Sequence, residues 1–375
     1  MIDVRRGDID MASVNGLEGI VAAETGISLV DGEGGRLVYR GYEARDLARA
    51  HSFEDVAHLL WFGHLPGAVE REGLVAKLRE HRKVPEEILR LVDQLPWGTD
   101  VMSVLRTVVS GLGVDGDWPP TEDQAIRVTA AVPTLIAHRH ARLRGVAPTA
   151  AHPTLPHVAN YLYMLSGGQI PANEHIRALQ AYLVLGMEHG MNASTFAARV
   201  VTSTQSDMVS ALTAAIGAMK GPLHGGAPSE VMTMLEDIGT LDRAEAWLRN
   251  ELEAGRRLMG FGHRVYKTRD PRAMALRAVV EGVKAKDPWF DLSVGVEDAA
   301  VRLLDEYKPG RRLYANVEYW AAAILRTTGI PKTLYTPTFT LGRCVGWGAH
   351  IMEQARHNRL IRPQSVYIGP MPEGR

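Results

Sequence analysis

The sequence predicts a mostly α-helical protein that carries one small β element. Apolar residues recur every three or four positions through most of the 375-residue chain, the spacing that places them on one face of a helix. Only one pair of short segments, near the N-terminus, has the composition of paired strands. The apolar share of 46% supports a sizeable core, and the length allows two domains.

The β element is predicted as a hairpin. Segments 27–30 and 36–40 are short and rich in β-branched and bulky side chains, and a glycine-rich turn at 31–35 joins them. Glycine-rich turns between two such runs are typical of hairpins.

The rest of the chain is predicted as helices separated by proline and glycine. In the first 220 residues, the stretches expected to be helical are 44–62, 67–82, 100–112, 121–144, 173–190, 192–204 and 207–219. In the C-terminal third they are 227–236, 241–255, 270–285, 296–307, 314–328 and 340–357. Glycine-containing breaks at 220–226 and 329–331 are the best candidates for domain boundaries.

Charge and cysteine content argue against several classes of function. The net charge of -1 provides no global positive field for nucleic acid or an anionic membrane surface. The N-terminus lacks the apolar core of a secretory signal, and no apolar run approaches the ~18 to 20 residues of a membrane span. Cys344 is the single cysteine, which we expect to be a small buried residue rather than a nucleophile. A soluble cytoplasmic protein is expected.

Common cofactor and metal motifs are absent or incomplete. No GxxxxGK[ST] phosphate loop occurs, and the dinucleotide-like start Gly260-Phe261-Gly262 has Val265 where the third glycine belongs. His138 and His140 are two positions apart, so on a helix they face different sides and cannot easily share a metal. The sequence therefore predicts neither a metal site nor a tightly bound cofactor.

Three histidines stand in glycine-rich surroundings. His189 precedes a glycine, His224 lies in a Gly-Pro-Leu-His-Gly-Gly-Ala run, and His263 follows a Gly-Phe-Gly run. Beside glycine, the backbone can approach a ligand closely and a loop can present an imidazole at a helix start. A single histidine beside glycine more often has a structural role. Three of them favour a functional site, although they do not indicate which reaction it catalyses.

Three arginines are candidates for holding an acidic substrate. Arg272 follows His263 closely in the chain, and Arg343 and Arg362 lie near the C-terminus. The planar guanidinium binds a carboxylate through two parallel hydrogen bonds, although a surface ion pair is the plain alternative for each residue. Histidines and arginines that converge would suit a small, multiply anionic substrate.

These segments together resemble the citrate synthase family. The most diagnostic pieces are His189 with Asn-Ala-Ser-Thr-Phe at 192–196, Gly-Pro-Leu-His-Gly-Gly-Ala at 221–227, and Gly-Phe-Gly-His-Arg-Val-Tyr-Lys with Asp-Pro-Arg at 260–272. The resemblance runs from the Gly-Leu-Glu-Gly region at 16–19, through Tyr-Arg-Gly-Tyr at 39–42, to Asn-Arg-Leu-Ile-Arg-Pro at 358–363. The compact length is similar to that of the short dimeric bacterial and archaeal branch.

The resemblance implies a fold and a domain division. The family's large helical domain would be formed by residues 1–225 and 330–375, and a small helical domain would be inserted at 226–329. A homodimer is implied too, because Arg362 would reach the partner subunit's site.

The resemblance also implies roles for the site residues. His224 would stabilise the enol(ate) of acetyl-CoA, and His263 would polarise and protonate the oxaloacetate carbonyl. His189, Arg272 and Arg343 would hold the dicarboxylate. Contacts with CoA, which enters as part of a substrate, would come from Arg256, Met259, Gly260, Phe261, Gly262 and Lys267.

One position departs from the family pattern. The general base is an aspartate in a segment like Asn-Val-Asp, whereas this chain has Asn316-Val317-Glu318. A carboxylate is kept, but the extra methylene moves its oxygens by about a bond length, and a misplacement of ~1 Å can cost ~100-fold in rate. Glu318 therefore suggests a slower synthase or one retuned to another acyl-CoA.

The predicted activity is that of a citrate (Si)-synthase-type acyltransferase, which condenses acetyl-CoA, oxaloacetate and water to citrate and CoA. Two alternatives remain open at this point. One is a 2-methylcitrate synthase that uses propionyl-CoA with the same residues. The other is a catalytically silent relative that binds CoA or a dicarboxylate.

Overall fold

The computed structural model confirms a mostly helical protein with a small antiparallel sheet near the N-terminus. It describes residues 15–17, 19–113, 116, 118–225, 227–263, 265–282 and 288–372. Glu18, Gly226 and Arg264, which belong to the motifs above, lie outside the described residues. In the part of the chain described, no helix is long and apolar enough to cross a membrane.

The sheet has three strands rather than the two predicted. Strands β1 (Ser28–Asp31) and β2 (Arg36–Tyr39) pair antiparallel with Ser28 opposite Tyr39, as the hairpin prediction requires. A third strand, β3 (Tyr42–Glu43), pairs with β2. Arg40 and Gly41 both have positive φ, of 47° and 91°. Two consecutive residues with positive φ form the kind of tight turn that joins twisted strands, so β2 folds back at once.

Ten α-helices occupy the described chain before residue 220, after a short 3-10 helix at Asn15–Leu17. They are α1 (Ala44–Ala50), α2 (Phe53–Phe62), α3 (Ala68–His81), α4 (Glu86–Gln94), α5 (Val101–Ser110), α6 (Glu122–Leu143), α7 (His157–Leu165), α8 (Asn173–Gly186), α9 (Ala193–Ser203) and α10 (Met208–Met219). Six follow among the described residues: α11 (Ala227–Ile238), α12 (Leu241–Glu253), α13 (Pro271–Gly282), α14 (Pro288–Tyr307), α15 (Val317–Thr327) and α16 (Tyr335–Arg356).

Three differences from the predicted helices have local causes. The stretch 44–62 is two helices, because Ser52 starts α2 with a reciprocal capping box to Asp55. The short helices α4 and α7 were not predicted. Each follows a proline, Pro85 or Pro156, that makes no side-chain cap, so neither has a polar residue to mark its start.

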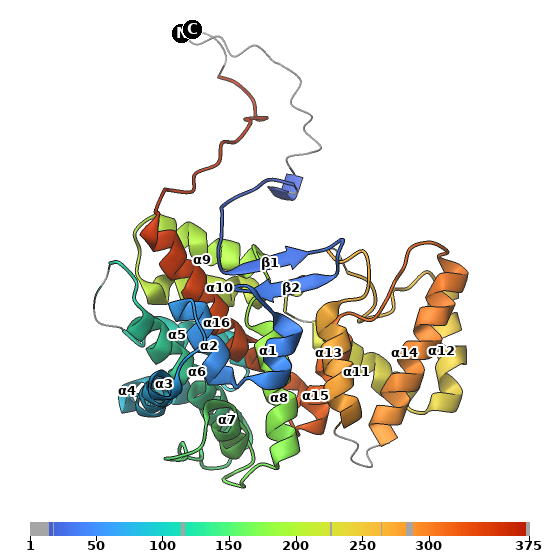
Figure 1. Cartoon of the computed structure of the whole chain (residues 1–375), viewed down its shortest axis with the longest axis horizontal. Coiled ribbons are helices and arrows are strands. Elements are labelled where there is room, and N and C mark those ends of the chain that lie inside the picture. The colour runs from blue at the N-terminus through green and yellow to red at the C-terminus, as the bar shows by residue number, and fades with distance from the viewer. Residues whose placement is uncertain are drawn as a thin grey trace.

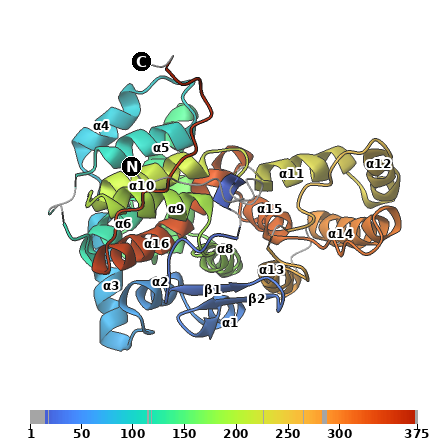
Figure 2. The same ribbon diagram turned by 90° about the horizontal axis from the view of Figure 1, so that it is seen from above.

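The core is organised around α16, which is buried along most of its length. It packs against α9, α6, α10, α2 and α8 (Figures 1 and 2). Trp61 and Trp347 are among the largest fully buried side chains, and the Trp61 indole donates to the Val345 carbonyl of α16 at 3.0 Å. Burying such aromatic side chains contributes strongly to folding. Cys344 is buried in this helix, as expected.

Helices α11, α12 and α14 extend to one side of the molecule (Figure 2). α12 packs on α14, α11 on α15, and α13 on both α15 and α8. The loops before α11 and α13 and the start of α15 lie on the side of these helices that faces α8 and the sheet (Figure 1). The division into 1–225 with 330–375 and 226–329 stays a prediction.

Candidate active site

The predicted site residues lie in loops and helix starts. His189 follows α8, His224 lies between α10 and α11, and His263 lies between α12 and α13. Glu318 is in the first turn of α15 and Arg343 is inside α16. Electrostatic coupling and hydrogen bonds, described below, connect these five residues with Arg272, so the structure brings six predicted residues together.

His224 is held by a hydroxyl from α9. Its Nε2 lies 2.7 Å from Ser194 Oγ, which also accepts a hydrogen bond from the Trp347 indole at 3.0 Å. Gly225 is required next to it, because a side chain there would collide with the Met219 carbonyl. Burial, and then the charge of Arg343, lower the pKa of His224 to about 4. The imidazole is therefore neutral at neutral pH.

His263 has a defined tautomer. The backbone amides of Val265 and Tyr266 donate to its Nδ1 at 3.0 and 3.1 Å. Since Nδ1 is an acceptor, a neutral ring carries its proton on Nε2. Burial, and then the charge of Arg272, lower the pKa of His263 to about 4, so this ring is neutral too.

His189 packs edge-on against the His263 ring, with centroids 5.7 Å apart. Its Nε2 lies 3.2 Å from the Tyr266 hydroxyl. Burial, followed by the charges of Arg272 and Arg343, lowers the pKa of His189 well below its usual range. Two cations and a second imidazole therefore surround this neutral ring.

Arg272 is buried and neutralised by an acidic neighbour. Its Nε and Nη2 donate to the two carboxylate oxygens of Asp270 at 3.0 and 2.8 Å, a two-point pairing. Asp270 also accepts from the backbone amide of Val317 at 3.0 Å, so it links Arg272 to the start of α15. The same Nη2 lies 3.1 Å from His263 Nε2.

Arg343 is a buried cation that feels the charges of Glu188 and Glu318 without a hydrogen bond to either. It is 2% exposed, and its Nε donates to the Gly186 carbonyl at 2.7 Å. Within the described residues its two terminal nitrogens make no hydrogen bond or ion pair, and the guanidinium stacks over Phe339 with its carbon 4.7 Å from the ring centroid. A buried charge without a hydrogen-bonded partner is costly, so this arrangement favours an anionic ligand.

Glu318 is a carboxyl group with a perturbed proton affinity. Asn316 caps α15 by accepting from the Glu318 amide at 3.0 Å, which fixes the backbone at this position. The carboxyl oxygens make no hydrogen bond to another described residue. Burial raises the pKa of Glu318 to about 7, against the opposing effect of Arg272. Such a value near neutrality suits a general base.

The loop that carries His263 is joined to the start of α15 by backbone contacts. Gly262 donates to the Tyr314 carbonyl and Asn316 donates to the Gly260 carbonyl, both at 2.8 Å. Gly260 and Gly262 both have a φ of 82°. A side chain at Gly260 would also meet Val231 at 2.8 Å and Tyr319 at 3.0 Å, so close packing and backbone conformation both require glycine here.

The remaining CoA candidates differ in their surroundings. Lys267 is exposed and lines a cavity of about 450 Å³ with His263, Arg311 and Arg312. Met259 and Phe261 are partly buried against the core. Arg256 is exposed and forms a two-point pair with Glu251, so its charge is already compensated.

Arg362 is not brought to this group. It is exposed in the extended segment after α16 and makes no hydrogen bond or ion pair with a described residue. Figure 1 shows this segment leading away from the helices.

Several supporting residues were not assigned roles from sequence. They are Ser194 and Trp347 around His224, Asp270 and Tyr266 around Arg272 and His189, and Arg311 and Arg312 at the cavity. Ser194 and Asp270 lie inside the most diagnostic motifs, so their place in those motifs could have indicated that they belong to the site. Nothing in the sequence connects Trp347 with Ser194, which is 153 positions away.

Comparisons with known proteins show which family this chain is similar to. The family model for citrate synthase, C-terminal domain, matches residues 16–364. Citrate synthase of Haloferax volcanii is 40% identical over 368 residues, covering 94% of this chain and 95% of that protein. The 2-methylcitrate synthase of Mycobacterium tuberculosis strain H37Rv is 40% identical over 364 residues, covering 94% of this chain and 90% of that protein.

Solved structures match along almost the full chain. Citrate synthase of Thermotoga maritima superposes with a TM-score of 0.85 at 38% identity and covers 96% of both chains. Citrate synthase of Thermoplasma acidophilum, solved as a ternary complex with carboxymethyl coenzyme A and oxaloacetate, has a TM-score of 0.87 at 29% identity and covers 96% of this chain and 97% of its own. The chain therefore belongs to the citrate synthase family.

Proposed function

We propose that this enzyme condenses acetyl-CoA with oxaloacetate and water to give citrate and CoA. The observation that carries the proposal is Arg343, a buried guanidinium whose terminal nitrogens make no hydrogen bond to a described residue and which is electrostatically coupled to His189, His224 and Glu318. A dicarboxylate would supply the missing negative charge. Arg272 and His189 would hold the same ligand, and the Thermoplasma acidophilum neighbour was solved with oxaloacetate bound.

The proposed first step forms the enol(ate) of the thioester. Glu318, with a pKa of about 7, takes a proton from the thioester methyl group. His224 donates a hydrogen bond to the developing oxyanion. This requires its proton on Nδ1, so the Ser194 hydroxyl, which donates to Asn192 Oδ1 at 2.8 Å in this structure, would turn its proton toward His224 Nε2, 2.7 Å away.

The second step joins the two substrates. The enol carbon attacks the ketone carbon of oxaloacetate, and His263 gives its Nε2 proton to the ketone oxygen. Water then hydrolyses the citryl thioester: it returns a proton to His263, the carbon–sulfur bond breaks, and the proton held by Glu318 goes to the departing thiolate, so CoA leaves as the thiol. None of these steps needs a redox change, and CoA takes part as a substrate.

We place CoA along the loop 259–262 and the basic mouth of the 450 Å³ cavity. Lys267, Arg311 and Arg312 contribute positive charges there that suit the phosphates of CoA. Arg256 is a weaker candidate than the sequence suggested, because Glu251 already pairs with it. Closure of a small domain 226–329 over the large domain would exclude water from the condensation.

We also propose a homodimer in which Arg362 completes the oxaloacetate clamp of the partner subunit. Its position on an extended C-terminal segment that leaves its own subunit supports this arrangement (Figure 1). The site would then be complete only in the dimer.

A second candidate is 2-methylcitrate synthesis from propionyl-CoA. The 40% identity to the Mycobacterium tuberculosis 2-methylcitrate synthase supports it. We favour acetyl-CoA because the Glu318 side chain, one methylene longer than the family's aspartate, would leave less room at the reacting carbon for the additional methyl group of propionyl-CoA.

The test measures thiol release with oxaloacetate and either acetyl-CoA or propionyl-CoA, and identifies the product by mass spectrometry. We expect citrate and a higher kcat/KM with acetyl-CoA. Glu318→Ala should abolish turnover while oxaloacetate still binds. A folded dimer that releases no thiol with either substrate would contradict both enzyme functions and leave a silent binding protein.

A further inference from the structure

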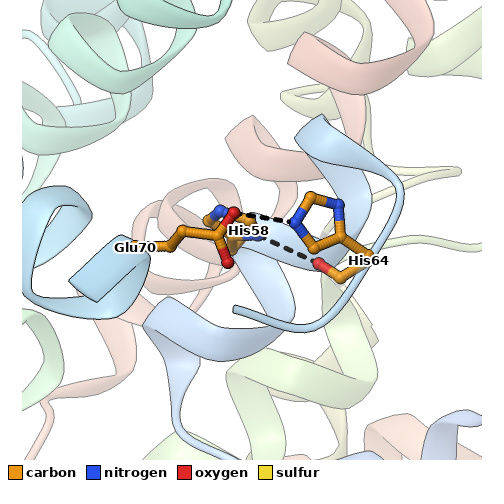
Figure 3. Close-up of side chains that lie close together, drawn as sticks. All are labelled: His58, His64 and Glu70. Atoms are coloured by element: carbon orange, nitrogen blue, oxygen red, sulfur yellow. Dashed lines mark hydrogen bonds and ion pairs between the residues drawn. The ribbon is translucent and has the colours of Figure 1, made fainter. Parts of the chain in front are cut away.

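A cluster of potential metal ligands lies in α2, the turn after it and the start of α3, none of which carries a residue of the site described above. His58 comes from the middle of α2, His64 from the turn after it, and Glu70 from the first turn of α3 (Figure 3). One ligand atom from each residue lies within 4.8 Å of the other two. Residues six positions apart do not share a helix face, so the turn itself brings these three together.

His58 is prepared for coordination. It is 4% exposed, and its Nδ1 donates to the His64 backbone carbonyl at 2.9 Å. A carbonyl can only accept, so the ring proton is on Nδ1 and Nε2 keeps a free lone pair. Histidines that bind metals usually donate their other ring nitrogen to a carbonyl or carboxylate in this way. Contact with Phe62, with ring centroids 4.5 Å apart, also fixes the ring.

His64 and Glu70 form a hydrogen bond at the position where a cation could bind instead of the shared hydrogen. His64 Nε2 lies 3.0 Å from Glu70 Oε1, while Glu70 Oε2 accepts from the Gly67 amide at 2.8 Å. The neighbouring cation Arg71 pairs with Asp55 instead. The Glu70 carboxylate is thus oriented by the backbone and has no arginine or lysine partner among the described residues.

The three ligand atoms, now within 4.8 Å of one another, would have to move only slightly closer together to bind a metal ion. Zn²⁺ binds nitrogen and oxygen ligands at about 2.0–2.2 Å, which puts neighbouring ligand atoms about 3.3 Å apart. The side chains of His64 and Glu70 are 57% and 48% exposed, so both can move toward the buried His58 ring. Water would fill the fourth position. Two imidazoles and one carboxylate select a transition metal rather than Mg²⁺ or Ca²⁺, which prefer oxygen ligands.

We propose that His58, His64 and Glu70 bind a divalent transition-metal ion, best matched by Zn²⁺, that ties α2 to the start of α3. This site is separate from the condensation chemistry. It departs from the sequence prediction, which named no metal site.

The experiment titrates ZnCl2 into chelator-treated, tag-free, full-length protein by calorimetry, and records the melting temperature with and without Zn²⁺. We expect one saturable site per chain and a melting temperature that rises with Zn²⁺, since a ligand that binds only the folded state stabilises it. His64→Ala and Glu70→Gln should each bind at least about 10-fold more weakly and lose most of the shift.

His138→Ala is the matched control. His138 also pairs with a carboxylate, with its Nε2 2.9 Å from Asp93 Oδ1, but no second imidazole accompanies that pair among the described residues. This variant should bind Zn²⁺ as the unchanged protein does. Folded His64→Ala protein that keeps wild-type affinity, or wild-type protein that shows no saturable binding, would overturn the proposal. Neither result bears on citrate synthesis, which is assayed separately.

Discussion

Arg272 Nη2 lies 3.1 Å from His263 Nε2, and both atoms carry protons when the histidine is in the tautomer that its backbone contacts select. Two donors that face each other have no acceptor between them in the protein itself. An oxygen atom of an anionic ligand would accept from both and relieve this mismatch. The pair therefore marks the position proposed for the ketone end of oxaloacetate, and explains why Asp270 must hold the guanidinium in place from behind.

Ser194→Ala should lower kcat by about 10- to 100-fold, because His224 loses the hydroxyl that orients its ring. The KM for oxaloacetate should change little, since Ser194 does not contact the arginines. Steady-state kinetics of the purified enzyme separate the two effects. Thr204→Ala, which removes an exposed hydroxyl bonded to the Val201 carbonyl at the end of the same helix, is the control. A rise in KM with unchanged kcat would argue against a positioning role.

The pH dependence should follow Glu318. Its pKa in the folded protein is about 7, raised by burial from an ordinary value of 4.5, so the carboxyl favours folding below about pH 4.5 and loses that contribution as pH rises through 7. Glu318→Gln should therefore be about 3 kcal/mol more stable than wild type at pH 8, with a smaller difference at pH 5. Urea unfolding at equal protein concentration measures this, and a pH-independent difference would contradict it. The kcat of the wild type should rise with pH through about 7.

Glu318→Asp should shift the acyl preference toward propionyl-CoA. The shorter side chain opens space beside the acyl carbon while it keeps a carboxylate as base. We expect the ratio of kcat/KM for propionyl-CoA over acetyl-CoA to rise by about 10-fold, the effect of one methylene group in a pocket. Glu281→Gln, an exposed carboxylate on α13, should leave the ratio unchanged. A fall in the ratio would contradict our account of the acyl preference.

Arg343→Gln should weaken oxaloacetate binding by about 100-fold, because the ligand loses a buried charge-assisted contact. Calorimetric titration without CoA measures this directly. Arg356→Gln, at the exposed end of the same helix where Arg356 pairs with Glu122, should bind normally. If both variants bound equally well, the dicarboxylate would have to be held elsewhere.

Mixed dimers test the partner role of Arg362. Glu318→Gln and Arg362→Gln should each be nearly inactive alone. If Arg362 acts across the interface, a heterodimer of the two has one site with both natural residues and one with neither. Random mixing should then recover about one quarter of wild-type activity. If Arg362 acted within its own subunit, every site would lack one residue and mixing would recover nothing.

The sequence predicted the helical class, the hairpin and most helices, because their periodicity and punctuation are local. It did not predict β3, whose pairing depends on Arg40 adopting a positive φ, nor α4 and α7, which begin after prolines. The histidines were recognisable from neighbouring glycines. The support of His224 by Trp347 and the approach of His58 to Glu70 were not, because they depend on how distant segments pack.

The backbone contacts between 260–262 and 314–316 join the loop of His263, proposed to activate the ketone, to the helix start of Glu318, proposed to deprotonate the thioester. The distance between His263 and Glu318 is therefore set by these main-chain hydrogen bonds and should stay the same when the proposed small domain moves. His224 lies on a different loop, so its distance from the two residues could change in such a movement. To change the acyl donor that the enzyme accepts, the side chain at position 318 should be varied while the backbone contacts between 260–262 and 314–316 are kept. Any change to Gly260 or Gly262 would displace the acid and the base at once.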